Sequence, residues 1–247
     1  MPKFFVKTEQ IQDEEIVIKG TDIKHIKSVL RMKEKDPIEI CNMESQENYM
    51  CEIHKIEEEQ ILCKIIQKKE ETSESEIKVT IFQGLPKSDK MELIIQKSVE
   101  LGVYDITPIE MARCVVKLNE KDKKKKIERW QKISEVAAKQ SQRDIIPKVN
   151  EIISIKQISN IMNQYDVIIV AYEKERQNTI KEELQQIKKQ KFNKIGIIIG
   201  PEGGLEEKEI EYLKENGAKV VTLGKRILRT ETVALNVLSN IIYELEV

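Results

Sequence analysis

The sequence contains few of the residues that build several common functional sites. Its 247 residues include two histidines and four cysteines, and aromatic residues make up 4%. Two histidines offer little material for a catalytic triad. The cysteines form no CxxC pair, which argues against a zinc site and a disulfide framework, and so few aromatics argue against a broad base-stacking platform. We therefore expect no metal and reduced, buried thiols.

Long apolar runs and a charge excess are missing as well. No apolar run approaches the length of a membrane span, and the N-terminal Met-Pro-Lys-Phe-Phe-Val does not resemble a signal peptide. We therefore expect a cytoplasmic protein with no membrane partner. The 42 Lys and Arg residues nearly cancel the 43 Asp and Glu residues, so any attraction for nucleic acid must come from a local cluster of charge.

Residues 1–72 predict a small β-rich domain. Residues 49–56 partly alternate apolar and polar side chains, as a half-exposed antiparallel strand does. The segment holds 12 Lys and Arg against 16 Asp and Glu, which is not typical of a generic RNA-binding module, so a scaffold role is the alternative. Residues 69–76 are polar and predict a linker.

After this linker, strand-like and helix-like segments alternate. Apolar runs at 77–82, 106–109, 166–172, 195–199 and 220–223 predict strands, and amphipathic segments lie between them. This alternation predicts an α/β fold with a mostly parallel sheet covered by helices on both faces.

Basic residues concentrate at 113–148, a segment that contains 12 Lys and Arg residues and 5 Asp and Glu residues. A helix is expected over 121–143, with the lysines pointing outward and an inward face made of Ile127, Trp130, Ile133, Val136 and Ala137. Such a charge run is usually a solvated helix face, but its concentration in a nearly neutral chain favours contact with RNA.

Two unusual loops follow predicted strands near the C-terminus. Gly200-Pro-Glu-Gly-Gly204 is neither the GxGxxG dinucleotide fingerprint nor a phosphate loop, and three glutamates in the following turns would repel phosphate. In the second loop, residues 223–232, two arginines flank the apolar pair Ile227-Leu228. Because ligands bind at the carboxyl ends of parallel strands, we expect both loops to form one pocket for a neutral or cationic ligand; an ordinary turn is the alternative for the first.

Several motifs together resemble the RsmE family of ribosomal RNA methyltransferases, within the SPOUT superfamily of knotted enzymes. They are Val29-Leu-Arg-Met-Lys33, Lys87-Ser-Asp-Lys-Met-Glu-Leu-Ile-Ile-Gln-Lys-Ser-Val-Glu-Leu-Gly102, Glu128-Arg-Trp-Gln-Lys-Ile133, Ala137-Ala-Lys-Gln-Ser-Gln-Arg143, Ile199-Gly-Pro-Glu-Gly-Gly204 and Leu223-Gly-Lys-Arg-Ile-Leu-Arg-Thr-Glu-Thr232. The resemblance extends over essentially the whole chain. Val233 departs from an expected Ala, and Gln142 from an expected Gly.

The resemblance implies a fold and an activity. Residues 1–72 would form a PUA-like β-barrel that positions RNA, and residues 73–247 an α/β SPOUT domain with a deep trefoil knot at its C-terminal end. The enzyme would use S-adenosylmethionine to methylate N3 of a uridine in small-subunit (16S) ribosomal RNA, on the assembled 30S subunit. Two copies would form a homodimer through the knot region.

Candidate site residues follow from these motifs and loops. Those expected to bind S-adenosylmethionine are Gly84, Leu85, Pro86, Ile199, Gly200, Pro201, Glu202, Gly203, Gly204, Leu223, Gly224, Ile227, Leu228, Arg229, Thr230 and Thr232. Those expected to contact RNA are Arg31, Lys33, Arg113, Lys123, Lys124, Lys125, Lys139 and Arg143.

Methylation of uridine N3 requires loss of a proton, so the site must accept that proton or stabilise the anion that remains. Arg229 is the first candidate for stabilising the charge, with a salt bridge to Glu231 or Glu202 as the alternative. Glu231 and Glu173 are the candidates for a base.

Three other functions remain to be compared with this one. The same fold could serve as a non-catalytic RNA-binding or ribosome-assembly factor, or as a methyltransferase acting on the ribose 2'-O position. A nucleotide-dependent oxidoreductase is disfavoured because the dinucleotide fingerprint is missing.

Overall fold

A computed structural model describes residues 1–246. The chain divides into two units, the first made of residues 1–74 and 138–146 and the second of residues 75–137 and 147–247. The segment 138–146, which the sequence analysis places in the C-terminal domain, therefore groups with the N-terminal unit. Within the described range every helix is too short or too polar to cross a membrane.

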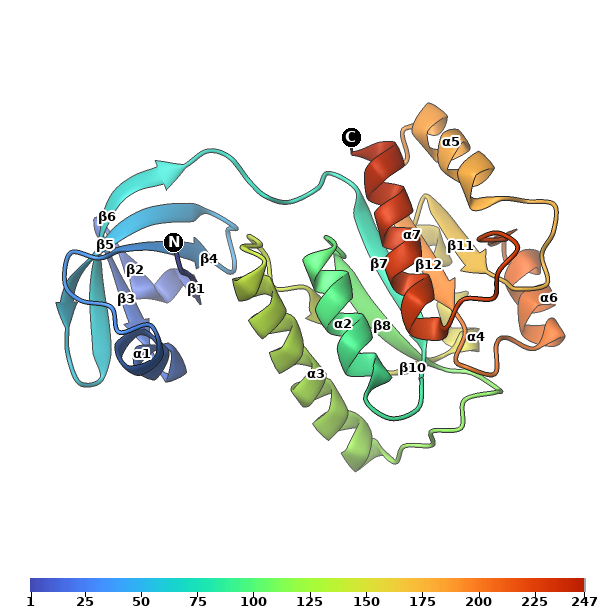
Figure 1. The fold of residues 1–247 in the computed structure, drawn as a ribbon, viewed down its shortest axis with the longest axis horizontal. Helices are drawn as coiled ribbons and strands as arrows, with labels where there is room; N and C mark the ends of the chain where they lie inside the picture. Colours follow the sequence, from blue (N-terminus) through green and yellow to red (C-terminus); the bar gives the residue numbers. More distant parts are fainter. Residues whose placement is uncertain (247) are drawn as a thin grey trace. The chain divides into compact units, whose positions relative to one another are not determined.

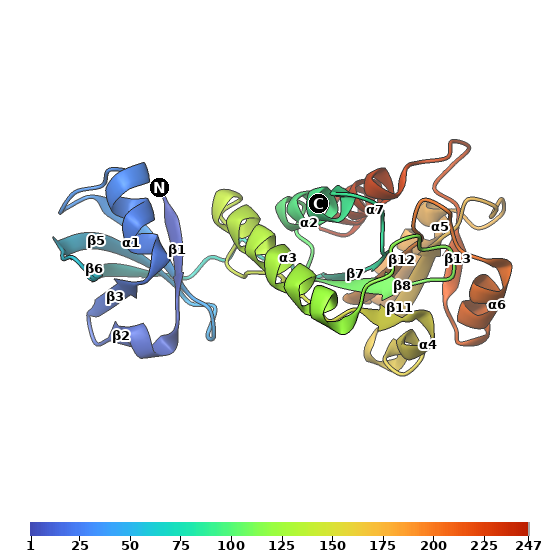
Figure 2. The same cartoon turned by 90° about the horizontal axis from the view of Figure 1, so that it is seen from below.

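The first unit is built on a six-stranded sheet that curls around its own core (Figure 2). The strands run in the order β1-β4-β5-β6-β3-β2, and only β1 and β4 pair in parallel. Alternate residues of these strands are fully buried, among them Ile16 and Ile18, because one face of an antiparallel sheet packs on the core. The strands are β1 (Lys3–Val6), β2 (Ile11–Gln12), β3 (Glu15–Lys19), β4 (Pro37–Asn42), β5 (Asn48–Ile56) and β6 (Gln60–Lys69).

Short helical segments complete this unit. The helix expected near Asp22 is α1 (Thr21–Lys24), which continues into the π-helical turn η2 (His25–Val29). Ile26 on this turn is fully buried in the core of the sheet. A 3-10 turn, η1 (Thr8–Gln10), connects β1 to β2.

The second unit contains a seven-stranded, all-parallel sheet (Figure 1), which confirms the predicted α/β class. Six strands run in the order β10-β8-β7-β12-β11-β13, and β9 pairs with β8. The central strands are continuous runs of buried Ile and Val because helices cover the sheet. The strands are β7 (Lys78–Gly84), β8 (Asp105–Glu110), β9 (Lys148–Val149), β10 (Ile153–Ser154), β11 (Val167–Ala171), β12 (Lys194–Ile199) and β13 (Lys219–Val221).

Helices lie on both sides of this sheet. On one side α7 packs against both α2 and α5, and α4 lies on the other side (Figure 2). The helices are α2 (Lys90–Glu100), α3 (Glu120–Gln140), α4 (Ile155–Ile158), η3 (Met162–Gln164), α5 (Ile180–Gln190), α6 (Glu207–Glu215) and α7 (Thr230–Leu245). On α3, Trp130 is buried as expected, whereas Val136 is 67% exposed, against the expectation.

The strand order predicts a ligand site at the carboxyl ends of the parallel strands. From β7 the chain continues to β8, which pairs with one side of β7. Later in the chain, β12 pairs with the other side of β7, and β11 and β13 lie beyond β12 in the sheet. The direction of strand order thus reverses between β7 and β12, and ligands bind at the carboxyl ends of strands beside such a reversal.

Candidate active site

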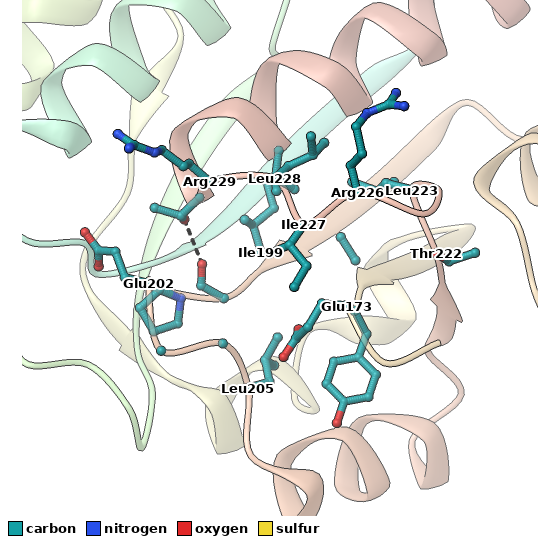
Figure 3. Close-up of a pocket in the computed structure, with 18 of the residues that line it drawn as sticks. Glu173, Ile199, Glu202, Leu205, Thr222, Leu223, Arg226, Ile227, Leu228 and Arg229 are labelled. Atoms are coloured by element: carbon teal, nitrogen blue, oxygen red, sulfur yellow. Dashed lines mark hydrogen bonds between the residues drawn. The ribbon is translucent and has the colours of Figure 1, made fainter. Parts of the chain in front are cut away.

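A cavity of about 500 Å³ lies at the carboxyl ends of β11, β12 and β13 (Figure 3). Three segments form its walls: residues 199–205 after β12, residues 171–176 from the end of β11, and residues 222–230 leading into α7. Gly203 and Leu228 both line it, so the two loops singled out in the sequence meet in space. A volume of this size is typical of small-molecule sites.

Close approach of main chain explains the glycines of the first loop. Gly204 has φ +68°, a conformation that favours glycine, and its N–H donates to the carbonyl oxygen of Pro201 at 2.9 Å. A Cβ atom at Gly204 would lie 2.9 Å from Oε1 of Glu173, and one at Gly200 would lie 3.1 Å from the carbonyl carbon of Gly204. A side chain at either position would therefore displace a wall of the cavity.

The loop after β7 supports the glycine loop and does not line the cavity. A Cβ atom at Gly84 would lie 2.7 Å from Cδ of Pro201, and Leu85 and Pro86 are buried. Gly84, Leu85 and Pro86 are among the residues expected from the sequence to bind the cofactor, but they lie outside the cavity lining.

A buried hydrogen-bond chain joins three segments behind the cavity. Gln83 at the end of β7 donates from Nε2 to Oγ1 of Thr230 at 2.9 Å, and that hydroxyl donates to the carbonyl oxygen of Gly200 at 2.7 Å. Gln83 is fully buried and Thr230 is 5% exposed. The start of α7 is thereby fixed to the glycine loop.

Near the surface, an ionic cluster joins α2 to the glycine loop and to the start of α7. Lys90 Nζ lies 3.0 Å from Oε1 of Glu202 and 3.4 Å from Oε2 of Glu231, and the N–H of Lys87 donates to Glu202 at 3.1 Å. Partial burial alone would raise the pKa of Glu202, but the backbone N–H groups and Lys90 hold that pKa below its usual value. The hydrogen bond to Glu202 in turn raises the pKa of Lys90.

The three candidates for catalysis occupy different environments. Arg229 lines the cavity, and its guanidinium has no ion pair or hydrogen bond within residues 1–246. Glu173 also lines the cavity, and its carboxylate points towards Leu205 and Ile227 (Figure 3). Glu231 is not in the lining; its Oε2 is buried and accepts no hydrogen bond within residues 1–246, and its contact with Lys90 Nζ is an ion pair at 3.4 Å.

Most of the expected cofactor residues after β12 and β13 line the cavity, while Thr232 is exposed outside it. Several other lining residues were not expected from the sequence, and four of them are charged: Lys90, Arg176, Lys225 and Arg226. Arg176 could have been found from its position shortly after the end of β11. Lys90 lies within one of the family motifs, but nothing in the spacing of that motif indicates that Lys90 reaches the cavity. The missed lining residues are Lys90, Ala171, Tyr172, Arg176, Leu205, Thr222, Lys225, Arg226 and Val233.

Arg143 and Lys139 differ from the exposed cations that RNA contact requires. Arg143 is 5% exposed, and its Nε donates to both carboxylate oxygens of Glu74, at 3.0 and 3.1 Å. Lys139 Nζ lies 2.9 Å from Oδ1 of Asp22. Because the guanidinium of Arg143 is buried and paired within the first unit, we remove this residue from the expected RNA contacts.

The remaining basic candidates lie at the surface. Lys123 forms ion pairs with Glu110 and Glu120, at 3.3 and 3.1 Å. Arg113 is exposed and donates from Nη1 to the carbonyl oxygen of Gly203 at 2.9 Å, which places a cation directly behind the glycine loop. The others, Arg31, Lys33, Lys124 and Lys125, are exposed.

Comparisons with known proteins match both units. Residues 73–242 match an RNA methyltransferase domain family, and residues 18–66 match an RNA methyltransferase PUA domain. The chain is 40% identical to the ribosomal RNA small subunit methyltransferase E of Bacillus subtilis, covering 100% of this chain and 98% of that protein. It is 33% identical to the protein of that name from Mesomycoplasma hyopneumoniae, over 98% of this chain and 99% of that protein.

A solved structure has a similar fold. The ribosomal RNA small subunit methyltransferase E of Neisseria gonorrhoeae, bound to S-adenosyl methionine, superposes with a TM-score of 0.86 at 28% identity. The similarity covers 98% of this chain and 97% of that one.

Proposed function

The chain belongs to the ribosomal RNA small subunit methyltransferase E (RsmE) family, and from this premise we propose that it methylates N3 of a uridine in 16S ribosomal RNA on the assembled 30S subunit, using S-adenosylmethionine. The single observation that supports this most is the meeting of the glycine loop and the 223–232 loop around one cavity. The relatives' names support the methyl transfer to small-subunit RNA, and the N3 position is our inference from the family resemblance.

The residues around the cavity suit this cofactor. Bare main chain at residues 200–204 and apolar side chains such as Ile199 and Leu228 offer surface for a nucleoside, and Glu173 and Arg176 offer charges to an ammonium and a carboxylate. When bound, S-adenosylmethionine supplies an electrophilic methyl group on a sulfonium ion. Three glycines and no phosphate-loop lysine fit a ligand without phosphate.

Arg229 has the position and charge to assist reaction at N3. Loss of the N3 proton leaves negative charge on the flanking carbonyl oxygens of the base, and a guanidinium stabilises such charge without acting as a base. Glu173, which lines the cavity, is our first candidate to accept the proton, ahead of Glu231, whose carboxylate is engaged by Lys90.

Calorimetry and base mapping test the proposed function together. We expect S-adenosylmethionine to bind the purified protein, and 30S subunits from a strain lacking the activity to gain one methyl group on a uridine base, located by mass spectrometry. Arg229→Ala should lower kcat roughly 10²- to 10³-fold, as removal of an oxyanion donor does. Absence of cofactor binding would contradict the proposal, and binding without methylation would favour an assembly factor. A methyl group on a ribose would move the acceptor to the 2'-O position.

We further propose that residues 1–72 position RNA and residues 73–247 hold the catalytic domain. The match of residues 18–66 to a PUA domain supports the first assignment. The exposed Arg31 and Lys33 are the candidate contacts there, and Arg113, Lys124 and Lys125 are those of the second unit. Each true phosphate contact should contribute about one unit to the salt dependence of binding.

We also infer a knotted C-terminal region, a homodimer and a cytoplasmic location from the family. Leu93 on α2 and Tyr243 on α7 are 43% and 77% exposed although these helices pack side by side, which leaves apolar surface for a second copy. Four free thiols suit a reducing compartment. The molar mass in solution tests the dimer.

A further inference from the structure

Glu202 lines the same cavity as Arg229 and Glu231 follows Arg229 by two residues, yet neither carboxylate forms an ion pair with it among residues 1–246. Glu202 comes from the glycine loop, and Glu231 lies two residues after Arg229 on the first turn of α7. Either one would neutralise the guanidinium if it formed a salt bridge with it. Figure 3 shows the side chains of Arg229 and Glu202 extending to the same side of the pocket without contact.

Lys90 engages both carboxylates instead. Its Nζ lies 3.0 Å from Glu202 and 3.4 Å from Glu231, so one ammonium bridges two anions that would otherwise repel each other. The N–H of Lys87 donates to Glu202 as well. The Lys90 and Glu231 side chains are 31% and 15% exposed, so these charges are only partly screened by solvent.

As a consequence, the Arg229 guanidinium is available to donate hydrogen bonds to a bound substrate. Among residues 1–246 this guanidinium has no acidic partner within 4.0 Å, although Glu202 lines the same cavity and Glu231 follows two residues later in the chain. An unpaired arginine at a cavity wall can donate to charge that appears only during the reaction, whereas a salt-bridged one must first give up its partner.

We propose that Lys90 is a positioning residue that holds Glu202 and Glu231 away from Arg229 and so keeps the guanidinium available to the acceptor base. The proposal rests on the proposed methyl transfer. Loss of the ammonium removes the ion pair of each carboxylate, and Arg229, which precedes Glu231 at the start of α7 and lines the same cavity as Glu202, is then a cation to which they can turn.

Substitution of Lys90 gives the first test. Lys90→Met should lower kcat/KM about 10- to 100-fold, up to the loss expected when a charge-stabilising donor is withdrawn. The affinity for S-adenosylmethionine, measured by calorimetry, should change much less, and Lys90→Arg should retain most of the activity because it keeps the cation. The matched control is Lys97→Met on the same helix, which breaks the ion pair with Glu100 away from the cavity.

Removal of the carboxylates distinguishes this role from the alternatives. If Lys90 acts by occupying Glu202 and Glu231, the triple variant Lys90→Met/Glu202→Gln/Glu231→Gln should be several-fold more active than Lys90→Met, because nothing is left to capture Arg229. A triple variant as poor as Lys90→Met overturns the proposal, since Lys90 would then act by direct contact or by fold support. Abolition of activity by Glu231→Gln alone also overturns it, because that carboxylate would itself take part in the reaction.

A structural measurement keeps this test separate from that of the proposed function. In a crystal structure of Lys90→Met we expect the Arg229 guanidinium within 4.0 Å of Glu202 or Glu231, whatever reaction the protein performs. A guanidinium that remains unpaired in a folded Lys90→Met protein contradicts the proposal. Absence of methylation by the wild type contradicts the proposed function and leaves this structural result to be judged by itself.

Discussion

At the scale of single residues, the cavity depends on glycines, which have no Cβ atom. The glycine loop passes so close to Glu173 and to itself that a methyl group at Gly204 would contact a carboxylate oxygen. Other glycines with positive φ have open space around them, Gly217 at the end of α6 being one. Gly217 is therefore required only by its backbone conformation, whereas Gly204 is required both by its conformation and by the lack of space for a side chain.

Gly204→Ala should weaken cofactor binding, and Gly217→Ala should not. Both substitutions force an alanine into positive φ, at a cost of about 1 kcal/mol in stability. Only Gly204→Ala also pushes on Glu173 at the cavity wall. Thermal unfolding should show similar losses for the two variants, whereas calorimetry with S-adenosylmethionine should show a loss of affinity for Gly204→Ala alone. Equal affinities would place the cofactor away from this loop.

At the scale of elements, the start of α7 is attached to the carboxyl end of the sheet twice. The buried chain from Gln83 through Thr230 to Gly200 is neutral, and the cluster of Lys90, Glu202 and Glu231 is ionic. The first connects β7, and the second α2, to the glycine loop and the start of α7, which form walls of the cavity. Helix packing against α2 and α5 alone would fix α7 less finely.

Thr230→Val tests the neutral attachment. The substitution keeps the shape of the side chain but removes the hydroxyl. The carbonyl oxygen of Gly200 then loses its donor, and Nε2 of Gln83 loses an acceptor. We expect a loss of about 1–3 kcal/mol in the free energy of unfolding, as for a buried polar group left unsatisfied, and weaker cofactor binding. Ser239→Ala, at an exposed position of the same helix, is the control. Unchanged unfolding would mean that water replaces the hydroxyl.

At the scale of the whole molecule, a segment from the middle of the chain completes the N-terminal unit. Asp144 is 3% exposed and forms an ion pair with the buried Lys3 of β1. It also accepts from the N–H of Ser73 at 2.6 Å and from Oγ1 of Thr72 at 2.8 Å. The residues expected to form a free linker thus bind the segment 138–146, and Arg143 with Glu74 adds a second ion pair there.

Asp144→Asn should destabilise the N-terminal unit and change its acid sensitivity. Burial alone would raise the pKa of Asp144, but Lys3 and the donors from residues 72 and 73 hold it below its usual value. The carboxylate therefore contributes stability that is present above the unfolded pKa of 3.8 and is lost as pH falls through the lower folded pKa. We expect a loss of roughly 3 kcal/mol near neutral pH, as for a broken buried ion pair, and a weaker pH dependence below about pH 4.

Unfolding in urea at several pH values measures both effects. Glu47→Gln is the control, because it breaks the exposed ion pair with Lys68 on the same sheet and exposed pairs contribute little. A variant with wild-type stability at neutral pH would show that the ion pair of Asp144 with Lys3 does not help to hold the segment 138–146.

Much of the local structure follows from the sequence. The apolar runs predicted β7, β8, β11, β12 and β13 to within a few residues, because strands buried on both faces need continuous Ile and Val. The position of the glycine loop after such a run indicated a ligand site. Val136 was assigned to the wrong face because helical periodicity does not say which neighbours cover a helix.

What the sequence alone determined is therefore the class of fold, the two loops and, through its motifs, the family. Only the tertiary structure decided that β12 lies between β7 and β11, that Arg143 is buried, and that Lys90 forms ion pairs with Glu202 and Glu231. Burial patterns report the environment of one element at a time, whereas strand order and ion pairing depend on contacts between residues that lie far apart in the chain.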